Sequence, residues 1–257
     1  MDPSKTALCL MAHPDDAEIL CAGTLALLAK RGWNIVIATM TPGQAGSVVL
    51  GREEISAVRR EEARHAAAVL NGSYHCLECE DVFITYDKET LLKAITLLRK
   101  VRPALVFTAS PSDYMLDHEI TSRITQTACL AAGIRNIAIE GTEPFTTVPH
   151  LYYSDPIQGK NIFGQEVPAD LYVDISSAID TKEEMLCCHK SQRDWLFQLS
   201  KVDEFVIMMK SFSEKNGRLI GAGFAEGFRQ HLGFSYPSDD LLSAELAEFA
   251  HFKPQTV

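Results

Sequence analysis

The chain has 257 residues, of which 46% are hydrophobic, and a formal net charge of −10 at pH 7. This length is enough for one large α/β domain, and the mean hydropathy of −0.01 is typical of a soluble globular protein rather than a disordered or membrane-embedded one. The negative charge argues against nonspecific nucleic-acid binding, which depends on Lys and Arg neutralising phosphates.

Cysteine usage and hydropathy indicate where the protein resides. There are seven cysteines, an odd number that suits reduced thiols better than a disulfide framework. No apolar stretch approaches the roughly 20 residues that span a bilayer, and charged residues follow the first short apolar run at once, unlike in a signal peptide. We therefore expect a cytoplasmic protein without a membrane span.

Strand-like and helix-like patterns alternate through the first 140 residues. Short apolar runs predict strands, and apolar positions at helical spacing predict helices between them. The expected strands cover residues 6–12, 34–40, 104–108, about 149–153 and about 170–174, and the expected helices cover 17–30, about 52–70, about 91–98, a segment from near His118, about 180–190 and about 198–215. Near-continuous apolar strands alternating with helices predict one domain built on a mostly parallel sheet with helices on both faces. Residues 221–257 form a tail that the pattern leaves unassigned.

Polar segments follow three of the expected strands. AHPDD follows the first, TPGQAGS follows the second, and SPSDYMLDH, residues 110–118, follows the strand at 104–108. Ligands of such sheets bind at the carboxyl ends of the strands, so we expect these segments to converge on one rim. The glycines of TPGQAGS are better explained by a loop that shapes this rim than by phosphate binding, because the segment has neither GxGxxG nor a Walker ending.

A metal site can be assembled from the first and last of these segments. His13 and Asp16 are three residues apart across a tight turn, so both side chains can reach one ion, and His118 could complete the set. Two imidazoles and one carboxylate, with a position left for water, form the layout of a catalytic zinc site. Asp15 would stand beside that water as the general base.

Two other interpretations use the same residues. The HPDD turn could be only a helix N-terminus, with Asp15 or Asp16 as the cap. The three ligands also match the facial triad of non-haem Fe(II) oxygenases, but an all-β barrel is expected there, and the alternating strands and helices contradict it.

A CxxC at Cys76–Cys79 could indicate redox chemistry or structural zinc, but the segment resembles a strand edge and no second pair accompanies it.

The sequence resembles the LmbE-like (PIG-L) zinc-dependent N-deacetylases. The resemblance covers about residues 6–230 and rests on six motifs: AHPDDAE (12–18), TPGQAGS (41–47), VRREEA (58–63), Asp117-His118, CHKSQ (188–192) and AEGFR (225–229). It implies a Rossmann-like sheet and hydrolysis of an N-acetyl group on a glucosamine unit of a small molecule. It also mildly suggests a homo-oligomer, either a trimer or a hexamer.

The resemblance also implies roles for individual residues. By the family pattern the zinc ligands are His13, Asp16 and His118, with Asp15 as the base. Arg59 matches a position that contacts the substrate. Asp81 and Gln44 are further candidates for substrate binding, although many relatives carry Glu where this chain has Gln44.

One position departs from the family pattern. Relatives commonly have His-Pro-Asp-His where this chain has Met115-Leu116-Asp117-His118. The first of those histidines helps to polarise the acyl oxygen, whereas a thioether cannot donate a hydrogen bond. Another donor could take its place, with Tyr114, His150 and Tyr153 as candidates. Otherwise the enzyme is slow or acts on a more reactive amide, or the protein binds its ligand without turnover.

These observations lead to three hypotheses. The first is a zinc-dependent amidase that removes an N-acetyl group from an amino-sugar-containing small molecule. The second is a noncatalytic sugar- or metabolite-binding protein on the same fold, motivated by Met115. The third keeps the metal but cleaves a different amide, such as one in a thiol conjugate.

Overall fold

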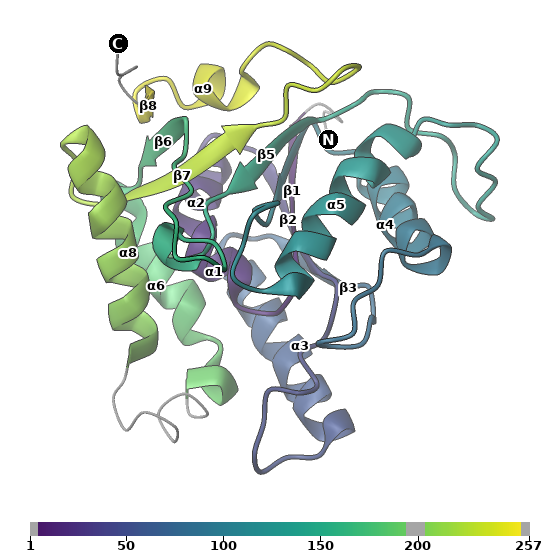
Figure 1. Ribbon diagram of the computed structural model, residues 1–257, viewed down its shortest axis with the longest axis horizontal. Coiled ribbons are helices and arrows are strands. Elements are labelled where there is room, and N and C mark those ends of the chain that lie inside the picture. Colours follow the sequence, from purple (N-terminus) through teal and green to yellow (C-terminus); the bar gives the residue numbers. More distant parts are fainter. Residues whose placement is uncertain (1–4, 194–203, 253–257) are drawn as a thin grey trace.

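The computed structural model describes residues 5–193 and 204–252 (Figure 1). One eight-stranded sheet runs through these residues in the order β3-β2-β1-β4-β5-β7-β6-β8. Its strands are β1 (Thr6–Met11), β2 (Asn34–Thr39), β3 (Ser73–Cys76), β4 (Leu105–Thr108), β5 (His150–Ser154), β6 (Leu171–Asp174), β7 (Ala225–Gln230) and β8 (Ala250–Phe252). The strands from β3 to β5 pair in parallel, whereas β7, β6 and β8 pair antiparallel. The expected α/β class with a mostly parallel sheet is confirmed.

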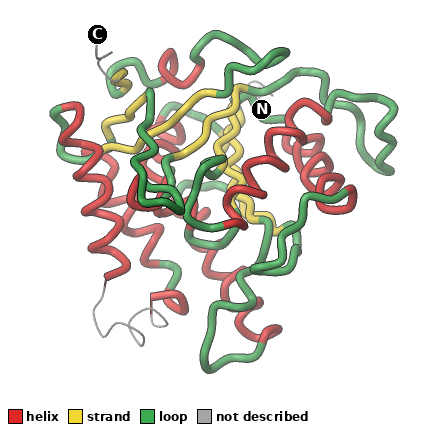
Figure 2. Tube along the Cα trace, in the orientation of Figure 1, coloured by secondary structure: helices red, strands yellow, loops and turns green. Residues whose placement is uncertain are grey.

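Helices cover both faces of this sheet (Figures 1 and 2). The described helices are α1 (Asp16–Leu20), α2 (Ala22–Lys30), α3 (Arg52–Val69), α4 (Lys88–Val101), α5 (Leu116–Ala131), α6 (Ile179–Cys187), α8 (Glu204–Ile220) and α9 (Leu241–Glu245), with 3-10 turns η1 (Ile157–Gly159) and η2 (Ser176–Ala178). Alternate side chains of the fully buried β1 enter two cores. Ala7, Cys9 and Met11 pack in the core with α2, α6 and α8, and Leu8 and Leu10 pack in the core with α4 and α5. The central strand is therefore apolar on both faces, as the sequence pattern predicts.

The helix expected over residues 17–30 is two helices, with a break at Cys21 (φ −134°). The second helix begins against a distant carboxylate. Glu226 on β7 accepts hydrogen bonds from the backbone N–H groups of Gly23 and Thr24, at 2.8 and 2.7 Å. Because the first N–H groups of a helix lack partners inside the helix, this contact favours a new N-terminus here. Helical spacing in the sequence carries no information about such a partner.

The C-terminal segment left unassigned by the pattern supplies an interior strand of the sheet. β7 lies between β5 and β6, and α9 and the edge strand β8 follow it. Its sequence, AEGFRQ, has two charged residues and a glycine in six positions, so it does not look like a buried strand. The expected helix over 198–215 begins among residues 194–203, which lie outside the described residues; α8 accounts for the rest of it.

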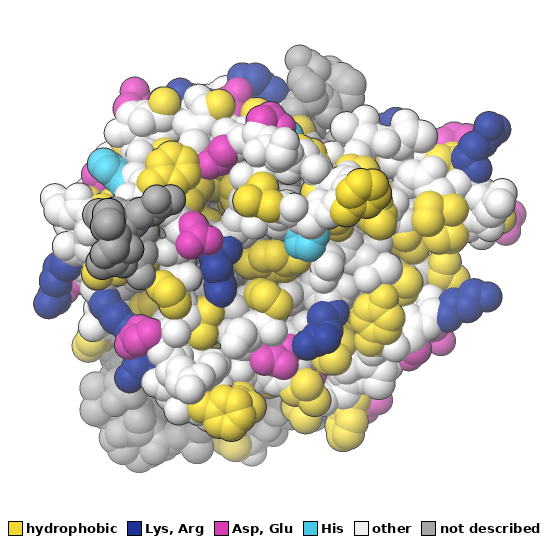
Figure 3. Space-filling view, turned by 45° about the horizontal axis from the view of Figure 1, so that its top comes forward, with side chains coloured by type: hydrophobic (Ala, Val, Ile, Leu, Met, Phe, Trp, Pro, Cys, Tyr) yellow, Lys and Arg dark blue, Asp and Glu magenta, His cyan; other side chains and the backbone are white. Residues whose placement is uncertain are grey.

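None of the described helices is both long and apolar enough to cross a membrane. Figure 3 shows basic side chains scattered singly over that face of the molecule, interspersed with acidic and hydrophobic ones.

A buried ion pair predicts where the fold is sensitive to mutation. Lys182 on α6 lies 2.6 Å from Glu226, and each side chain is only 1% exposed. We expect Glu226→Ala to lower the free energy of unfolding by about 3–5 kcal/mol, because it leaves a buried ammonium unpaired and removes the cap of α2. Urea unfolding measures this.

The matched control is Glu248→Ala, which removes the carboxylate of an exposed pair with Arg31 at 2.7 Å. Exposed pairs contribute at most about 1 kcal/mol. Equal unfolding midpoints for the two variants would contradict a structural role for the buried pair.

Candidate metal centre and active-site cavity

The turn after β1 brings His13, Asp15 and Asp16 together. The N–H of His13 donates to the Asp16 carboxylate at 2.8 Å, which closes the turn over three residues. Asp15 has a φ of 104°, in the left-handed region that residues other than glycine rarely adopt. Such backbone strain clusters at functional sites, where it aims a side chain in a required direction.

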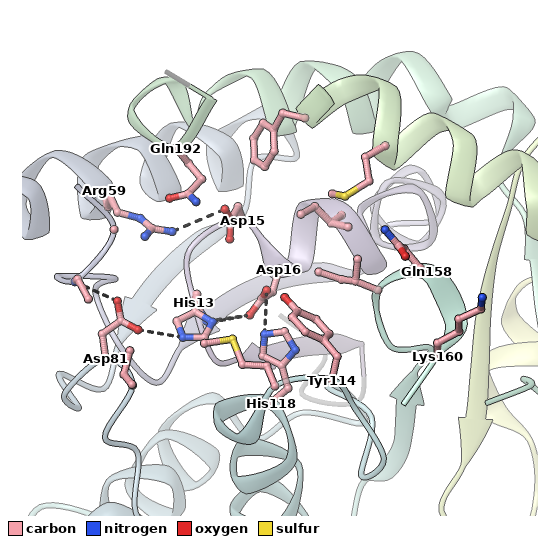
Figure 4. Close-up of a pocket in the computed structure, with 18 of the residues that line it drawn as sticks. His13, Asp15, Asp16, Arg59, Asp81, Tyr114, His118, Gln158, Lys160 and Gln192 are labelled. Carbon is pink, nitrogen blue, oxygen red and sulfur yellow. Dashed lines mark hydrogen bonds and ion pairs between the residues drawn. The ribbon is translucent and has the colours of Figure 1, made fainter. Parts of the chain in front are cut away.

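His118, at the start of α5, faces this turn. Its Nε2 lies 3.4 Å from Asp16 Oδ1, and His13 Nδ1 lies 3.4 Å from Asp16 Oδ2. All three residues are buried, and each offers a ligand atom within 4.8 Å of the other two (Figure 4). The structure thus brings together the three expected ligands from segments about 100 residues apart.

Three further carboxylates orient the two imidazoles. Asp113 Oδ1 lies 3.0 Å from His118 Nδ1, on the side of the ring away from Asp16. Asp81 and Asp117 lie 3.1 and 3.3 Å from His13 Nε2. A carboxylate that accepts the outer N–H of a histidine leaves the inner nitrogen free for a metal ion. The donor set therefore fits a divalent cation such as zinc, with two imidazole nitrogens and one carboxylate.

A second group of possible ligands, His13 with Asp81 and Asp117, shares its imidazole with the first. One neutral imidazole has a single lone pair for a metal, so it serves one of the two groups. Asp117 Oδ2 also accepts a hydrogen bond from the N–H of Val82 at 2.8 Å, and Asp81 Oδ2 accepts one from Ala45 at 3.1 Å. We therefore assign Asp81 and Asp117 to holding His13.

The carboxylates also set the charge of the site. Burial lowers the pKa of His118, but the nearby carboxylates of Asp16 and Asp113 outweigh it and raise this pKa to about 10. Burial likewise lowers the pKa of His13, and hydrogen bonds to Asp117, Asp16 and Asp81 raise it well above its ordinary value. Because acidic groups outnumber basic ones, this cluster attracts positive charge to the position between the imidazoles.

Asp15 lies beside the cluster and is held by Arg59 from α3. Burial raises the pKa of Asp15 to about 6, and Arg59, 3.6 Å away, opposes this rise. A carboxylate with a pKa in this range is a stronger base than an exposed one and remains ionised at neutral pH. Arg59 is 4% exposed and donates to the carbonyl oxygens of Pro14 at 2.7 Å and Gly43 at 3.2 Å.

The glycines of TPGQAGS make room for this arginine. A Cβ at Gly43 or Gly46 would lie 2.4 or 2.5 Å from Arg59 Nη1. The loop after β2 therefore packs directly on the guanidinium, which in turn holds the turn after β1. The glycine-rich segment serves close packing at the site, in agreement with its interpretation as a loop that shapes the rim.

This packing gives a prediction for Gly46→Ala. The added methyl displaces the guanidinium from Asp15, so we expect turnover to fall about tenfold, consistent with the sensitivity of catalysis to small misplacements. The control is Gly51→Ala, because a Cβ there meets nothing within 4 Å. Steady-state kinetics and thermal unfolding of both variants separate misplacement from loss of stability. Equal turnover in the two variants would contradict a positioning role for Arg59.

The cluster lies in the wall of a cavity of about 740 Å³ (Figure 4). Lining residues come from the turn after β1, the loops after β2, β3 and β4, the segments after β5 and α6, and the helices α1, α3, α5 and α8: His13, Asp15, Asp16, Ile19, Ala45, Gly46, Arg59, Asp81, Val82, Tyr114, Met115, His118, Ile157, Gln158, Lys160, Asn161, Gly164, Gln192, Phe205 and Met208. A cavity of this size suits a small molecule larger than a monosaccharide.

The three candidates for a hydrogen-bond donor in place of the family histidine differ in whether they line the cavity. Tyr114 lines it together with Met115. His150 and Tyr153 are not among the described lining residues; His150 Nε2 lies 3.1 Å from Asp239, and the Tyr153 hydroxyl lies 2.9 Å from His231 Nδ1.

The candidate substrate contacts lie in different places. Arg59 and Asp81 line the cavity, although both are also engaged in holding the turn after β1 and His13. Gln44 is not among the described lining residues, and its amide donates to the Cys79 carbonyl at 3.4 Å. Sequence reasoning missed the orienting roles of Asp113 and Asp117. Their only signal was proximity to His118 in the sequence.

The chain is similar to several known proteins. Residues 8–129 match the PIG-L family, described as GlcNAc-PI de-N-acetylase. The chain is 26% identical over 230 residues to diacetylchitobiose deacetylase of Thermococcus kodakarensis, covering 88% of this chain and 82% of the relative. It is 29% identical over 201 residues to 4-oxalmesaconate hydratase of Pseudomonas putida, covering 74% and 75%.

A solved structure shares the fold. N,N'-diacetylchitobiose deacetylase from Pyrococcus horikoshii superposes with a TM-score of 0.76 at 24% identity, covering 93% of this chain and 89% of that one. The stretch that matches the PIG-L (LmbE-like) family runs from within β1 into α5, the part of the chain in which the turn after β1, Arg59 and His118 meet.

Proposed function

We propose that this protein is a zinc-dependent hydrolase that removes an N-acetyl group from an amino-sugar-containing small molecule. The observation that carries the proposal is a cavity whose wall holds two imidazoles and a carboxylate next to a second, buried carboxylate. The 26% identity to a diacetylchitobiose deacetylase, over 88% of this chain, supports an N-acetylated sugar as the substrate.

In this proposal the metal is held by His13, Asp16 and His118. A bound zinc ion would supply Lewis acidity, which lowers the pKa of a water to about 7 and polarises the acyl carbonyl. Asp113 keeps the outer nitrogen of His118 engaged, and Asp81 with Asp117 does the same for His13. These contacts hold both rings with their inner nitrogens facing Asp16.

Asp15 acts as the general base. Its carboxylate lies in the cavity wall next to the ligand Asp16, and Arg59 holds it in place. It takes the proton from the attacking water and later passes it to the nitrogen of the leaving amine, which departs as the free amino sugar while the acetyl group departs as acetate.

Tyr114 supplies the hydrogen-bond donor that Met115 cannot. Its ring packs edge-on against His118 with the ring centroids 5.4 Å apart, and Figure 4 shows its hydroxyl on the side of Asp16. Partial burial, together with Asp16, Asp113 and Asp15, raises the pKa of Tyr114, so the hydroxyl keeps its proton and can donate to a developing oxyanion.

A second candidate function is hydration of an unsaturated carboxylic acid. It is favoured by the 29% identity to 4-oxalmesaconate hydratase over 74% of the chain. Water addition to a carbon–carbon double bond uses the same water and base but needs no donor for an acyl oxyanion. The methionine at position 115 is compatible with that reaction.

The test is acetate release by zinc-loaded protein from N-acetylglucosamine, N,N'-diacetylchitobiose and an N-acetylglucosaminyl inositol. In parallel, loss of ultraviolet absorbance reports hydration of a conjugated unsaturated dicarboxylate. Acetate release supports the deacetylase. Loss of absorbance without acetate supports the hydratase. Tight sugar binding without either product would indicate the noncatalytic binding protein, and turnover of thiol-conjugate amides alone would indicate the third hypothesis.

Metal binding is tested separately. After dialysis against metal-free buffer and reloading with zinc, wild-type protein should hold one zinc ion that His118→Ala loses, as measured by elemental analysis. Equal zinc content in the two proteins would contradict the ligand assignment.

A further inference from the structure

One buried hydrogen-bond acceptor in the cavity wall has no partner. Gln192 lines the cavity and is 9% exposed. Its Oε1 is buried and accepts no hydrogen bond from any described residue. Such atoms are rare in folded proteins, because burying a polar group without a hydrogen bond is unfavourable. In the wall of a cavity, the simplest donor for this oxygen is a bound ligand.

The segment that carries Gln192 is anchored at two points. Ser191 donates through its N–H and its hydroxyl to the Glu62 carboxylate of α3, at 2.8 and 2.6 Å. His189 Nε2 lies 3.3 Å from Glu18 Oε2 on α1, and both of these side chains are buried. Helices α1 and α3 also contribute to the cavity wall, so the position of Gln192 is set by the same elements as the rest of the site.

The amide of Gln192 lies on the Asp15 side of the cavity. A Cβ at Gly46 would lie 3.2 Å from Gln192 Oε1 and 2.5 Å from Arg59 Nη1, so these two groups border the same space. Arg59 in turn lies 3.6 Å from Asp15. In the view of Figure 4, Asp15 lies between the Gln192 amide and Asp16. Gln192 is therefore placed near the proposed base rather than among the proposed metal ligands.

The proposed reaction indicates which ligand group this acceptor meets. Asp15 passes a proton to the leaving nitrogen, so that nitrogen must come within hydrogen-bond reach of Asp15. A secondary amide nitrogen also carries an N–H, which needs an acceptor once it is buried. Gln192 Oε1 is a nearby acceptor that no described residue uses. A hydrogen bond to it would turn the nitrogen lone pair toward Asp15 as the nitrogen becomes pyramidal.

We propose that Gln192 Oε1 accepts a hydrogen bond from the N–H of the scissile amide and so makes the site selective for amides over esters. The inference rests on the proposed deacetylase function and adds the type of acyl bond that the site accepts. An ester has an oxygen in place of the N–H, so its lone pairs would face the Gln192 oxygen. A site built to accept a hydrogen bond discriminates against a ligand without the donor, because the buried acceptor then stays unpaired.

The experiment compares two substrates of the same size. They are the methyl glycoside of N-acetylglucosamine and the methyl glycoside of glucose acetylated on its C2 hydroxyl, which differ in the atom that bears the acetyl group. Acetate release from both is measured with zinc-loaded wild-type protein and with Gln192→Met, a side chain of similar length without an amide oxygen. We expect the ratio of kcat/KM for the amide to kcat/KM for the ester to fall about tenfold in Gln192→Met.

Two further variants serve as controls. Gln192→Glu keeps an acceptor oxygen and should retain the ratio, because an added charge beside Asp15 affects both substrates alike. Gln126→Met makes the same substitution at an exposed residue of α5 that does not line the cavity, and it should leave the ratio unchanged. Partial unfolding of any variant lowers both rates equally, so the ratio is insensitive to a loss of stability.

The outcomes distinguish this inference from the function beneath it. Equal losses for amide and ester in Gln192→Met would overturn it and assign Gln192 to supporting Arg59, whose Nε is also buried without a described partner. An unchanged amide rate would overturn it as well, and deacetylation would stand in both cases.

Absence of acetate from both substrates would overturn the deacetylase. Isothermal titration of the amide and the ester into zinc-loaded wild-type protein and Gln192→Met then decides the N–H contact. Tighter binding of the amide in the wild type that is lost in Gln192→Met would support the contact, and equal binding of the two compounds by the wild type would contradict it.

Discussion

Asp15→Asn should reduce acetate release by about 100- to 10,000-fold, the range that a positioned general base contributes. The amide side chain has nearly the same shape but cannot accept the proton of the attacking water. Because Asp15 is not a ligand in our assignment, zinc content should stay at the wild-type level. Measuring turnover and zinc content on one preparation tests both statements.

The control for this substitution is Asp170→Asn, the same chemical change at an exposed residue that does not line the cavity. It should leave turnover unchanged. If Asp15→Asn retained more than about a tenth of wild-type turnover, the base would have to be another group. If it lost zinc, Asp15 would belong to the ligand set.

The convergence of the three proposed metal ligands could be predicted from the sequence because it follows from topology. Apolar runs identify β1 and β4 as buried parallel strands, and the carboxyl ends of such strands meet at one rim. His13 and Asp16 follow the first of these strands, and His118 follows the second. Adjacency of β1 and β4 in the sheet then brings them within ligand distance.

The contacts that orient the site could not be predicted in the same way. Asp81 reaches His13 from a loop after the edge strand β3, and the distance of 3.1 Å depends on the path of that loop. Arg59 was expected to contact substrate, yet its terminal nitrogens donate to Pro14 and Gly43 carbonyl groups. The space for it is created by glycines whose role is visible only once the loop is folded.

The part of the fold that was hardest to predict is β7, which a buried ion pair stabilises. β7 is an interior strand whose Glu226 caps α2 and pairs with Lys182, so its polar residues are satisfied by elements more than 40 positions away. Sequence periodicity detects amphipathic and apolar segments, and a strand stabilised by a buried ion pair is neither. This explains why the C-terminal segment had no readable pattern.

Tyr114→Phe should lower kcat for deacetylation by about 100- to 1000-fold, the usual cost of removing one oxyanion donor. The ring and its packing against His118 remain, so KM should change little. The control is Tyr86→Phe, because Tyr86 is 49% exposed and Tyr114 is 50% exposed, and only Tyr114 lines the cavity. Wild-type turnover in Tyr114→Phe would show that its hydroxyl makes no contact with the developing charge.

Introducing the family histidine at position 115 is a second test of Tyr114 as the oxyanion donor. Met115 lines the cavity beside Tyr114, so an imidazole at position 115 could donate to the same oxygen. If Tyr114 fills the role of that histidine, Met115→His should rescue the Tyr114→Phe variant by at least about tenfold and change the parent enzyme much less, because one donor already serves it. Equal increases in turnover in the parent enzyme and in the Tyr114→Phe variant would mean that positions 114 and 115 act independently. In that case Tyr114 does not replace the family histidine, and Met115 makes the enzyme slower.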